Sequence, residues 1–413
     1  MAKADVLIGL QWGDEGKGQI TEYLSSKYNV VARFMSEPNC ARILPHGINM
    51  VDKTIILGNG VVISPDELMK EVKLLEDAGI YLKDRLFISK KSHLLMPSHR
   101  MLDKAYDSLR GGNKIGSSRQ GVGPTCADKA NRIGLRVGDI NDHFAERFAT
   151  HKAQHETILR AMHYFSPLEN KEIEDKWLEG IDFMKQFQFV DTERKMNQLL
   201  KDGNKILCEG SRGTMLDVDF GSYPFVASSN MVSASACIGL GLPPTSVGEI
   251  YGVAKAYSTR VGAGPLPTEI FDSSAKKIRE KGEEIGTGTE SERRCGWIDL
   301  VALKYAVMIN GVTKLIITKN HALDEFETIK ACVAYKKDVE FIDYYPDGIS
   351  RDEVEPVYVE MQGWKQQLQN ARSAEELPPA FLEYIAFIAK EVGVPVTCVS
   401  VGPDLCHVIE MSK

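Results

Sequence analysis

The chain has 413 residues, of which 43% are hydrophobic and 26% are charged, and its formal net charge is −7. This is the composition of an ordinary globular protein, and the length allows one large α/β domain or two smaller ones. The negative charge argues against a general nucleic-acid-binding protein, which carries a basic face, but it is compatible with a small anionic ligand held by a local cluster of donors.

The sequence carries no mark of export or of membrane insertion. Residues 1–10 are too short and too acidic for a secretory signal, and no stretch approaches the roughly 20 apolar residues that span a bilayer. The eight cysteines are scattered singly, without zinc-ligand spacing, which indicates reduced thiols. We therefore expect a cytoplasmic protein that acts on small molecules, with neither a nucleic acid nor a membrane as its partner.

Short apolar runs, rich in valine and isoleucine, recur along the chain. They cover residues 6–10, 54–57, 205–207, 249–254, 314–317 and 396–399. Continuous runs of this length are typical of strands that are buried on both faces of a mostly parallel sheet. Helical patterns lie between them, for example at residues 65–78 and 379–392. This alternation predicts a large doubly wound α/β fold with its ligand at the carboxyl ends of the strands.

Residues 141–200 have an almost wholly helical pattern that is polar on one face. We interpret this segment as a helical insertion beside the sheet and not as a separate domain. The predicted organisation is therefore one domain over residues 1–413 with an insertion at about 141–200.

The first predicted strand runs into a glycine-rich turn, QWGDEGKG at residues 11–18, and then into a helical stretch at residues 19–27. Such a turn exposes backbone N–H groups and a helix N-terminus, which together bind phosphate oxygens. Within the turn, Lys17 can neutralise a phosphate, and Asp14 can bind magnesium or accept a proton.

The turn is not a regular Walker A motif. Six residues separate Gly9 from Gly16, and Gly18 replaces the usual serine or threonine. A purely structural glycine turn is the alternative interpretation, and the aspartate and lysine inside the turn disfavour it.

A second signal, Thr318-Lys319-Asn320-His321, directly follows the predicted strand at residues 314–317. GTP-binding proteins carry a Thr/Asn-Lys-x-Asp turn at this place, where the lysine packs on guanine and the aspartate accepts both guanine N–H donors. A neutral imidazole has one acceptor nitrogen and cannot make that pair. The motif therefore favours ATP, or a relaxed choice between ATP and GTP.

A series of sequence blocks, in the same order along the chain, resembles the adenylosuccinate synthetase family. The blocks lie at residues 11–18, 56–65, 114–124, 128–139, 209–230, 253–269, 292–306 and 400–404. In that family GTP phosphorylates the 6-oxygen of IMP, and the amine of aspartate then displaces the phosphate. Phosphorylation turns a poor leaving group into a good one, and Mg²⁺ screens the crowded charge.

The resemblance implies a set of site residues. The catalytic residues are Asp14, as base, and Lys17, with Arg42 standing where the family has its catalytic histidine. The nucleotide-binding positions are Gly13, Glu15, Gly16, Gly18, Lys319, His321, Ser400, Gly402 and Pro403. The substrate-binding positions are Asn39, Ser118, Arg132, Arg212, Ala227, Ser228 and Arg260. The amine loop holds Thr287, Thr289, Ser291 and Arg293, and the metal positions are Asp14 and Ala41. A homodimer is also implied, with Arg132 acting in the site of the partner.

Several of these positions depart from the family pattern. Arg42 replaces a histidine, a stretch of residues expected between Arg42 and Ile43 is missing, and Arg212 replaces a glutamine that faces the base. An arginine supplies positive charge but cannot deliver a proton, because its pKa stays above about 12.

The predicted amine loop departs from the family in charge. Ser291 replaces an arginine, and Glu290 and Glu292 add two carboxylates beside a site for a dicarboxylate. Loss of an Arg–carboxylate contact and the added repulsion favour an amine that is less acidic than aspartate.

Three functions remain open from the sequence. The first is an active ligase that phosphorylates an oxygen of a nucleotide or of a carboxylic acid and then joins an amine. The second is a catalytically silent nucleotide-binding paralogue, and the third is an ordinary purine-succinylating enzyme that tolerates the changes. The retained Asp14 and Lys17 favour an active enzyme, since a binding module needs no base beside the phosphates.

Other histidines are weaker candidates for function. His151 and His155, four residues apart, have the spacing of a metal site, but we interpret them as solvated helix residues. We interpret His93 and His99 as surface or core residues.

Overall fold

The computed structural model describes the chain in six stretches. They are residues 2–35, 42–111, 118–164, 170–284, 292–349 and 353–411. Five of the predicted site residues lie outside these stretches: Asn39, Ala41, Thr287, Thr289 and Ser291.

Within the described residues, the centre of the molecule is a ten-stranded sheet with the order β17-β16-β12-β9-β1-β8-β2-β3-β5-β7. Its strands are β1 (Ala4–Gly9), β2 (Val30–Arg33), β3 (Thr54–Leu57), β5 (Leu86–Ser89), β7 (Gln188–Val190), β8 (Ile206–Glu209), β9 (Val247–Lys255), β12 (Lys314–Thr318), β16 (Val396–Ser400) and β17 (Val408–Glu410). The neighbouring pairs are parallel except β16 and β17 at one edge. The predicted mostly parallel α/β sheet is confirmed, and each of the predicted apolar runs lies in it.

Helices cover both faces of this sheet. They include α1 (Lys17–Ser25), α2 (Pro65–Asp77), α7 (Thr192–Lys201), α8 (Ser235–Leu240), α10 (Leu300–Asn310) and α11 (Pro379–Val392). Alternate residues of β1 point to opposite faces, so Val6 and Ile8 join a core that includes α7, α8, α10 and α11, whereas Leu7 packs with Ile20 and Leu24 of α1. The sheet is thus doubly wound, as the alternation of runs and helices predicted.

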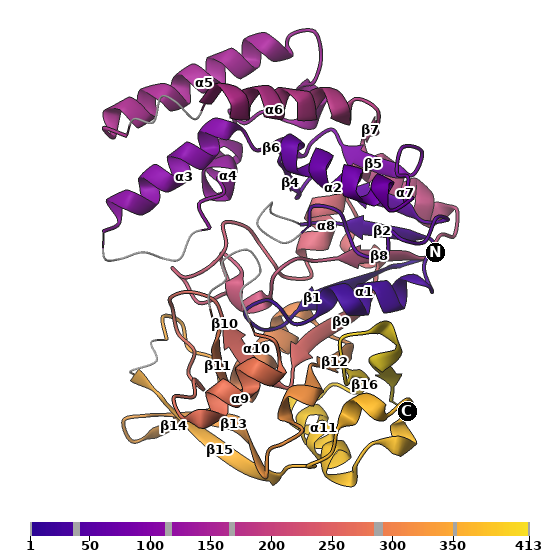
Figure 1. The fold of residues 1–413 in the computed structure, drawn as a ribbon, viewed down its shortest axis with the longest axis vertical. Coiled ribbons are helices and arrows are strands. Elements are labelled where there is room, and N and C mark those ends of the chain that lie inside the picture. The colour runs from indigo at the N-terminus through magenta and orange to yellow at the C-terminus, as the bar shows by residue number, and fades with distance from the viewer. Residues whose placement is uncertain are drawn as a thin grey trace.

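A second, smaller sheet lies beside the carboxyl edge of the first (Figure 1). Its strands are β10 (Tyr257–Arg260), β11 (Arg294–Asp299), β13 (Thr328–Lys337), β14 (Glu340–Ile342) and β15 (Glu355–Gln362), and most of its pairs are antiparallel. Helix α9 (Ser273–Lys281) packs against β11. A two-stranded sheet pairs β4 (Val62–Ile63) with β6 (His93–Leu94). Neither small sheet was predicted.

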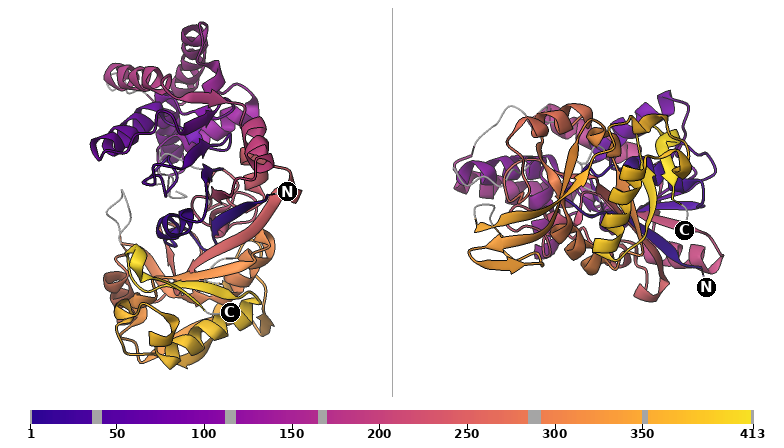
Figure 2. Two further views of the ribbon diagram at one scale, coloured as in Figure 1. Left: turned by 90° about the vertical axis from the view of Figure 1, so that its right-hand side faces the viewer. Right: turned by 90° about the horizontal axis from the view of Figure 1, so that it is seen from below.

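A group of helices covers one end of the molecule. It comprises α3 (Pro97–Leu109), α4 (Val122–Asn131), α5 (Phe144–Ala161) and α6 (Asn170–Met184). Figure 1 and the left view of Figure 2 place these helices at the end of the long axis that is opposite α11. Stacked rings of Phe144, Phe148 and Trp177 join α5 to α6, with ring centroids 5.0 to 6.4 Å apart.

The predicted insertion at residues 141–200 is not wholly helical. Within it, β7 (Gln188–Val190) pairs with β5 and forms one edge of the main sheet. The sequence did not predict this strand because it has only three residues and its side chains are partly exposed, so no continuous apolar run marks it. The single-domain organisation stays a prediction.

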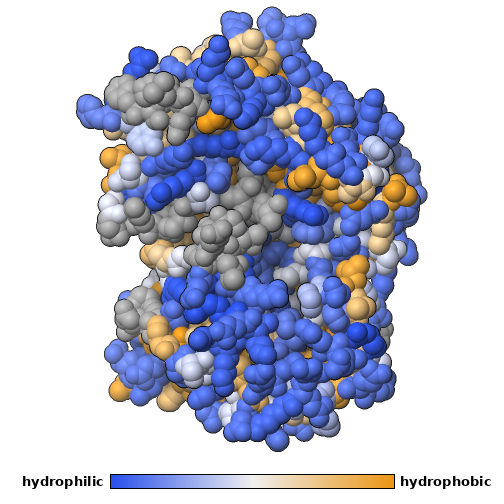
Figure 3. Space-filling view, in the orientation of Figure 1, coloured by the Kyte–Doolittle hydropathy of each residue, from blue (hydrophilic) through white to orange (hydrophobic). Residues whose placement is uncertain are grey.

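The face seen in Figure 3 is mainly hydrophilic, with hydrophobic residues in small groups. Among the described residues, no helix combines the length and the apolar character that crossing a membrane requires.

Candidate active site

The loop between β1 and α1 has the geometry of a phosphate-binding turn. Gly13, Asp14 and Gly16 all have positive φ angles of 87°, 60° and 79°. Helix α1 begins at Lys17, two residues before the predicted start at residue 19, because Gly18 and Lys17 already have helical geometry. The first N–H groups of α1 have no partner within the helix, and they face the carboxyl edge of the sheet, where an anion can accept from them.

Glu15 holds this loop from the inside. Its buried carboxylate accepts the backbone N–H groups of Gln11 and Gly13 at 3.0 and 2.9 Å, and its second oxygen lies 2.6 Å from Lys17 Nζ. Residue 9 must be glycine, since a Cβ there would lie 2.3 Å from Glu15 Oε2. Glu15 and Lys17, both predicted to bind nucleotide, thus form an internal ion pair that shapes the loop.

Asp14 points out of the loop, with its side chain 44% exposed, and meets Arg293. The distance between Asp14 Oδ2 and Arg293 Nη2 is 3.0 Å. Arg293 is the last of the predicted amine-loop residues, and it directly precedes β11. The predicted catalytic base and the described end of the amine loop therefore lie in one place.

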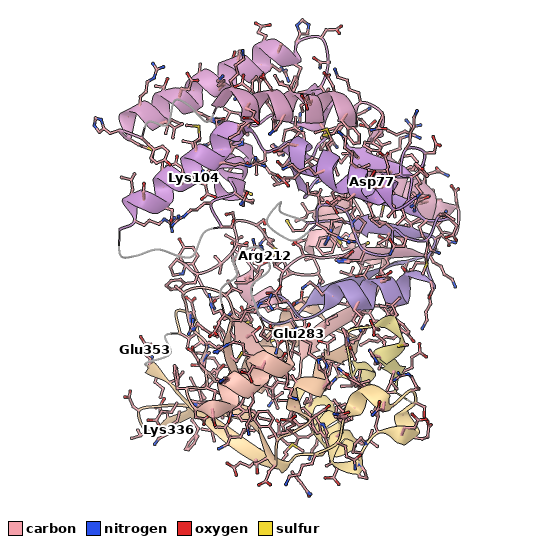
Figure 4. The ribbon with its side chains drawn as sticks, in the orientation of Figure 1. Asp77, Lys104, Arg212, Glu283, Lys336 and Glu353 are labelled. Carbon is pink, nitrogen blue, oxygen red and sulfur yellow. The ribbon has the colours of Figure 1, made fainter. Side chains whose placement is uncertain are left out.

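Arg293 belongs to a buried ion cluster around Glu284. Glu284 accepts from Arg293 at 2.7 Å, from Lys255 and Lys319 at 3.1 Å each, and from the Tyr257 hydroxyl at 2.6 Å. Burial alone raises the pKa of Glu284, but the two lysines, the tyrosine and Arg293 together lower it to about 2. Glu284 therefore stays ionised and holds Arg293 toward Asp14. Glu283, its neighbour after α9, is labelled in Figure 4.

The predicted base-recognition turn lies at the end of β12. Lys319 has φ 54° and donates to the carbonyl oxygen of Gly282 at 2.7 Å. His321 has a buried Nδ1 with no hydrogen-bond partner among the described residues, and burial and the nearby Lys319 lower its pKa to about 4. The imidazole is neutral near pH 7, so an unpaired buried nitrogen remains for a ligand.

The loop after β16 closes the other side of this region. The Ser400 hydroxyl donates to Gln19 Oε1 at 2.7 Å, and the Gln19 amide donates to the carbonyl oxygen of Gly402 at 2.8 Å. Pro403 follows on the surface. The nucleotide-binding residues predicted from the beginning, middle and end of the chain are thus brought together around the start of α1.

Arg260 is buried and fully engaged within the protein. Its guanidinium donates to the carbonyl oxygens of Ala263, Pro265 and Phe225 and to the Ser222 hydroxyl at 2.7 to 3.0 Å. Burial lowers its pKa to about 10. Arg260, predicted to bind substrate, thus connects the loop at residues 222–225 with the loop at residues 263–265.

Arg212 and Ala227 lie in the segment that connects β8 to α8. Arg212 has φ 54°, its backbone lies against the phosphate loop at Gly13, and Figure 4 shows it at the middle of the molecule. Ser228 faces the start of α4, where a Cβ on Gly123 would lie 3.3 Å from its hydroxyl. The N–H of Ala227 is bonded to the carbonyl oxygen of Leu216 at 2.8 Å.

The remaining predicted substrate residues lie around α4. Ser118 is exposed before α4, and Arg119, beside it, pairs with Asp107 at 2.7 Å. Arg132 is exposed and ends α4 with φ 64°. It is therefore accessible on the surface of the described chain, as the dimer prediction requires.

Arg42, the predicted catalytic arginine, is exposed, and its carbonyl oxygen accepts from Arg33 at 3.4 Å. His46, which the sequence analysis did not single out, lies against the phosphate loop at Gly18. His46 Nδ1 lies 2.7 Å from Glu209 Oε1, and its ring lies against Gly18. The pair is 163 residues apart in the chain, so no local motif marks it.

The interpretation of His155 as a solvated helix residue is wrong. His155 is 1% exposed and, with His99, is hydrogen-bonded to Asp128 at 2.9 and 2.8 Å. The backbone N–H of Met96 donates to His99 Nδ1, so the proton of the His99 ring is on Nε2 and is donated to Asp128. The ring nitrogens that face Asp128 are therefore hydrogen-bonded within the protein. His99 is a core residue, which was one of the two interpretations made from the sequence.

Asp14 has the chemistry that a Mg²⁺ ligand needs. Its carboxylate is partly exposed in the phosphate loop, and its Oδ2 lies 3.0 Å from Arg293 Nη2. Hard oxygen donors next to bound phosphates are what Mg²⁺ prefers. The residues present therefore fit the ion, while the second predicted metal position lies outside the described residues.

The sheet, the loop at its carboxyl edge and the ion cluster define an α/β enzyme of the phosphate-loop type. The sequence profile of the family described as Adenylosuccinate synthetase matches residues 6–409. The chain is 52% identical over 420 residues to the adenylosuccinate synthetase of Bacteroides thetaiotaomicron, covering 99% of each protein. It is 48% identical over 417 residues to that of Porphyromonas gingivalis, covering 98% of each. The chain therefore belongs to the adenylosuccinate synthetase family and is a nucleoside-triphosphate-dependent carbon–nitrogen ligase.

Solved structures agree with this placement. The fully ligated adenylosuccinate synthetase of Plasmodium falciparum superimposes with a TM-score of 0.91 at 32% identity, and all of each chain is covered. The succinoaminodeoxyadenylate synthetase (PurZ) of cyanophage S-2L, bound to dGMP and dATP, has a TM-score of 0.64 at 20% identity, and there the likeness is one of fold.

Proposed function

We propose that the chain joins aspartate to C6 of IMP, at the expense of a purine nucleoside triphosphate and with Mg²⁺ bound at Asp14. Full-length identity to adenylosuccinate synthetases supports this reaction. It also favours aspartate over the less acidic amine that the composition of the amine loop suggested. The single structural observation that carries the proposal is the contact between Asp14 and Arg293, which joins the phosphate loop to the amine side of the site at 3.0 Å.

Asp14 acts as the base. Its carboxylate takes the proton from N1 of the 6-oxopurine, and the electron pair moves to the 6-oxygen, which attacks the γ-phosphorus as the bond to the β-phosphate breaks. The amine nitrogen then adds at C6 and loses a proton to solvent, and the C6–O bond breaks with release of phosphate. Bound Mg²⁺ would screen the phosphate charge in the first step.

Arg293 serves both steps from one position. Its guanidinium is held by Glu284 on one side and contacts Asp14 on the other, at 2.7 and 3.0 Å. It supplies positive charge beside Asp14 and near the place where the carboxylates of aspartate would bind.

The choice of nucleotide follows from His321. With a pKa of about 4 its imidazole is neutral, and it offers guanine one acceptor instead of two. We infer that the chain discriminates weakly between GTP and ATP.

A catalytically silent paralogue is the second candidate. Two observations favour it: Arg42 replaces the family histidine, and the Lys17 ammonium is already paired with Glu15 at 2.6 Å. It predicts nucleotide binding without turnover.

The test is release of phosphate together with mass-spectrometric detection of the succinylated nucleotide. IMP and aspartate are supplied with Mg²⁺ and with ATP or GTP in turn, and Asp14→Asn is compared with a matched control, Asp84→Asn, at an exposed carboxylate. Product that disappears only in Asp14→Asn supports the proposed reaction. Binding of nucleotide without product supports the silent paralogue, and product with another amine but not with aspartate rejects aspartate as the co-substrate.

A further inference from the structure

The segment that follows Arg42 is held from two sides. Arg33 donates to the carbonyl oxygens of Arg42 and Leu44 at 3.4 and 3.0 Å, and Glu71 accepts the backbone N–H of Ile43 at 2.8 Å. The family resemblance implies further residues between Arg42 and Ile43, which this chain does not have. The connection brings His46 against Gly18 in the first turn of α1, and it brings Gly47, at φ 77°, against Ser25 at the end of α1, too close for a side chain.

His46 is fixed in this segment by a single buried carboxylate. Its backbone N–H donates to Glu209 Oε2 at 2.8 Å, and its Nδ1 donates to Glu209 Oε1 at 2.7 Å. Glu209 ends β8, is 1% exposed, and also accepts from Arg33 at 3.3 Å. The two hydrogen bonds to the Glu209 carboxylate fix the position of the His46 backbone and the orientation of its ring.

The other ring nitrogen lies over the phosphate loop. A Cβ built on Gly18 would be 2.5 Å from His46 Nε2 and 2.8 to 2.9 Å from the neighbouring ring carbons. The ring therefore occupies the space of the missing side chain at residue 18. In a regular Walker A motif a serine or threonine fills that position and reaches the metal and phosphates. The His46 side chain is 30% exposed, and no described residue makes a hydrogen bond to its Nε2.

Glu209 is a stable partner for the ring. Burial raises its pKa, but the charges of Arg33 and His46 and the bonds from His46 lower it to about 2, so Glu209 is an anion throughout the neutral range. A carboxylate on Nδ1 fixes a proton there and sets the orientation of the ring, so that Nε2 faces the phosphate loop. The imidazolium form donates at both nitrogens and suits an anion on each side.

From this geometry we infer that His46 is the residue whose imidazole contacts the nucleotide phosphates of this chain, with Glu209 as its positioning residue. The inference rests on the proposed function and deepens it, because it assigns to His46 the imidazole that is missing at Arg42. As the bond from the β-phosphate oxygen to the γ-phosphorus breaks, its electron pair stays on that oxygen. His46 Nε2–H donates a hydrogen bond to the growing charge, and no covalent bond forms to the ring.

The first experiment needs no turnover. The chain is labelled with ¹⁵N-histidine, and the His46 ring signals, assigned with His46→Asn, are followed as ATP or GTP is added with Mg²⁺. The expected result is a shift of the Nε2 signal that saturates with nucleotide, while the exposed His143 does not respond. A His46 signal that stays unchanged at saturating nucleotide, or a protein that binds neither nucleotide, would overturn the inference.

The second experiment measures catalysis. His46→Asn is expected to lower kcat about 100-fold, the usual effect of removing one donor to a developing oxyanion, with KM for IMP nearly unchanged. His143→Asn is the matched control. Arg42→Ala separates the alternatives: if it abolishes turnover while His46→Asn does not, Arg42 has the role and the inference is wrong.

The results that would reject the proposed function differ from those that would reject the role of His46. A wild-type chain without turnover, but with a nucleotide-dependent shift of His46, rejects the ligation reaction and leaves the phosphate contact of His46 in place.

Discussion

The hydroxyl of Thr318 donates a hydrogen bond to the backbone carbonyl of Glu15, with 2.6 Å between the two oxygens. This bond joins the end of β12, which leads into the base-recognition turn, to the middle of the phosphate loop. Since Glu15 also accepts the N–H groups of Gln11 and Gly13 through its side chain, Thr318 is tied to a residue that shapes the loop. The predicted base-recognition turn and the predicted phosphate loop are therefore joined by a direct hydrogen bond.

The first prediction concerns this bond. Thr318→Val keeps the shape of the side chain but leaves the buried carbonyl of Glu15 without its donor, which costs about 1 to 3 kcal/mol. We expect nucleotide affinity to fall about tenfold, measured by calorimetric titration with ATP and GTP. Thr397→Val, at a hydroxyl that only reaches the carbonyl of Leu315 at 3.5 Å, is the control and should bind as the wild type does. Equal affinities in all three proteins would contradict the coupling.

The second prediction concerns Arg293. Arg293→Met removes a buried cation from between Asp14 and Glu284, and breaking a buried ion pair in this way costs about 3 kcal/mol of unfolding free energy. We expect both lower stability in chemical denaturation and loss of turnover. Arg147→Met breaks an ion pair with Asp139 in which the arginine side chain is 54% exposed, and it should change stability by less than about 1 kcal/mol. A stable, active Arg293→Met would remove this residue from the mechanism.

The third prediction is a pH dependence. The pKa of Glu284 falls from its ordinary 4.5 to about 2 in the folded chain, so the unfolded state binds the proton more readily. The stability from this group is fully present above about pH 4.5 and is lost as the pH falls toward 2, a total of about 3 kcal/mol. Unfolding free energies at pH 6 and pH 3 should differ less in Glu284→Gln than in the wild type.

Should Glu284→Gln fail to fold, the wild-type chain still tests the same point. The carboxyl carbon of Glu284 can be followed by ¹³C NMR, and a titration midpoint near 4.5 would contradict the prediction.

The fourth prediction concerns nucleotide choice. His321→Asp restores two acceptor oxygens for guanine, and we expect the ratio of kcat/KM for GTP over ATP to rise at least tenfold, which corresponds to about 1.4 kcal/mol. His321→Asn, which offers one acceptor oxygen and a donor, is the matched variant and should leave the ratio near that of the wild type. If both variants behave alike, residue 321 does not contact the base.

The fifth prediction tests the proposed dimer. Asp14→Asn and Arg132→Ala should each be inactive, but equal mixtures that exchange subunits form heterodimers with one intact site, which restores about a quarter of the wild-type activity. Sedimentation of the wild-type chain gives the mass of the assembly and so distinguishes a monomer from a dimer. A monomer, or a mixture that stays inactive after exchange, would reject a site shared between subunits.

The main sheet could be predicted from the sequence because its strands are continuous apolar runs with both faces buried. The second sheet could not, since β13 and β15 mix buried, intermediate and exposed residues and carry no clean alternation. The start of α1 was placed two residues late because glycine is a poor helix former, and Gly18 is used here for the space it leaves to His46.

The site residues also fall into those that could be predicted from the sequence and those that could not. Asp14, Lys17 and Lys319 lie in local motifs and could be named from the residues around them. The pairing of His46 with Glu209 and of Arg293 with Glu284 depends on tertiary contacts between residues that are far apart or unmarked in the sequence. No local pattern carries that information.

The position of β1 within the sheet has a consequence for how the chain is made. The neighbours of β1 are β8 and β9, so the strand that opens the chain has no hydrogen-bonded partner until residues 206–209 and 247–255 have left the ribosome. The phosphate loop, although encoded at the start, can be assembled only late in synthesis. A truncated nascent chain that ends before β9 should therefore be unable to retain nucleotide, however long it is allowed to wait.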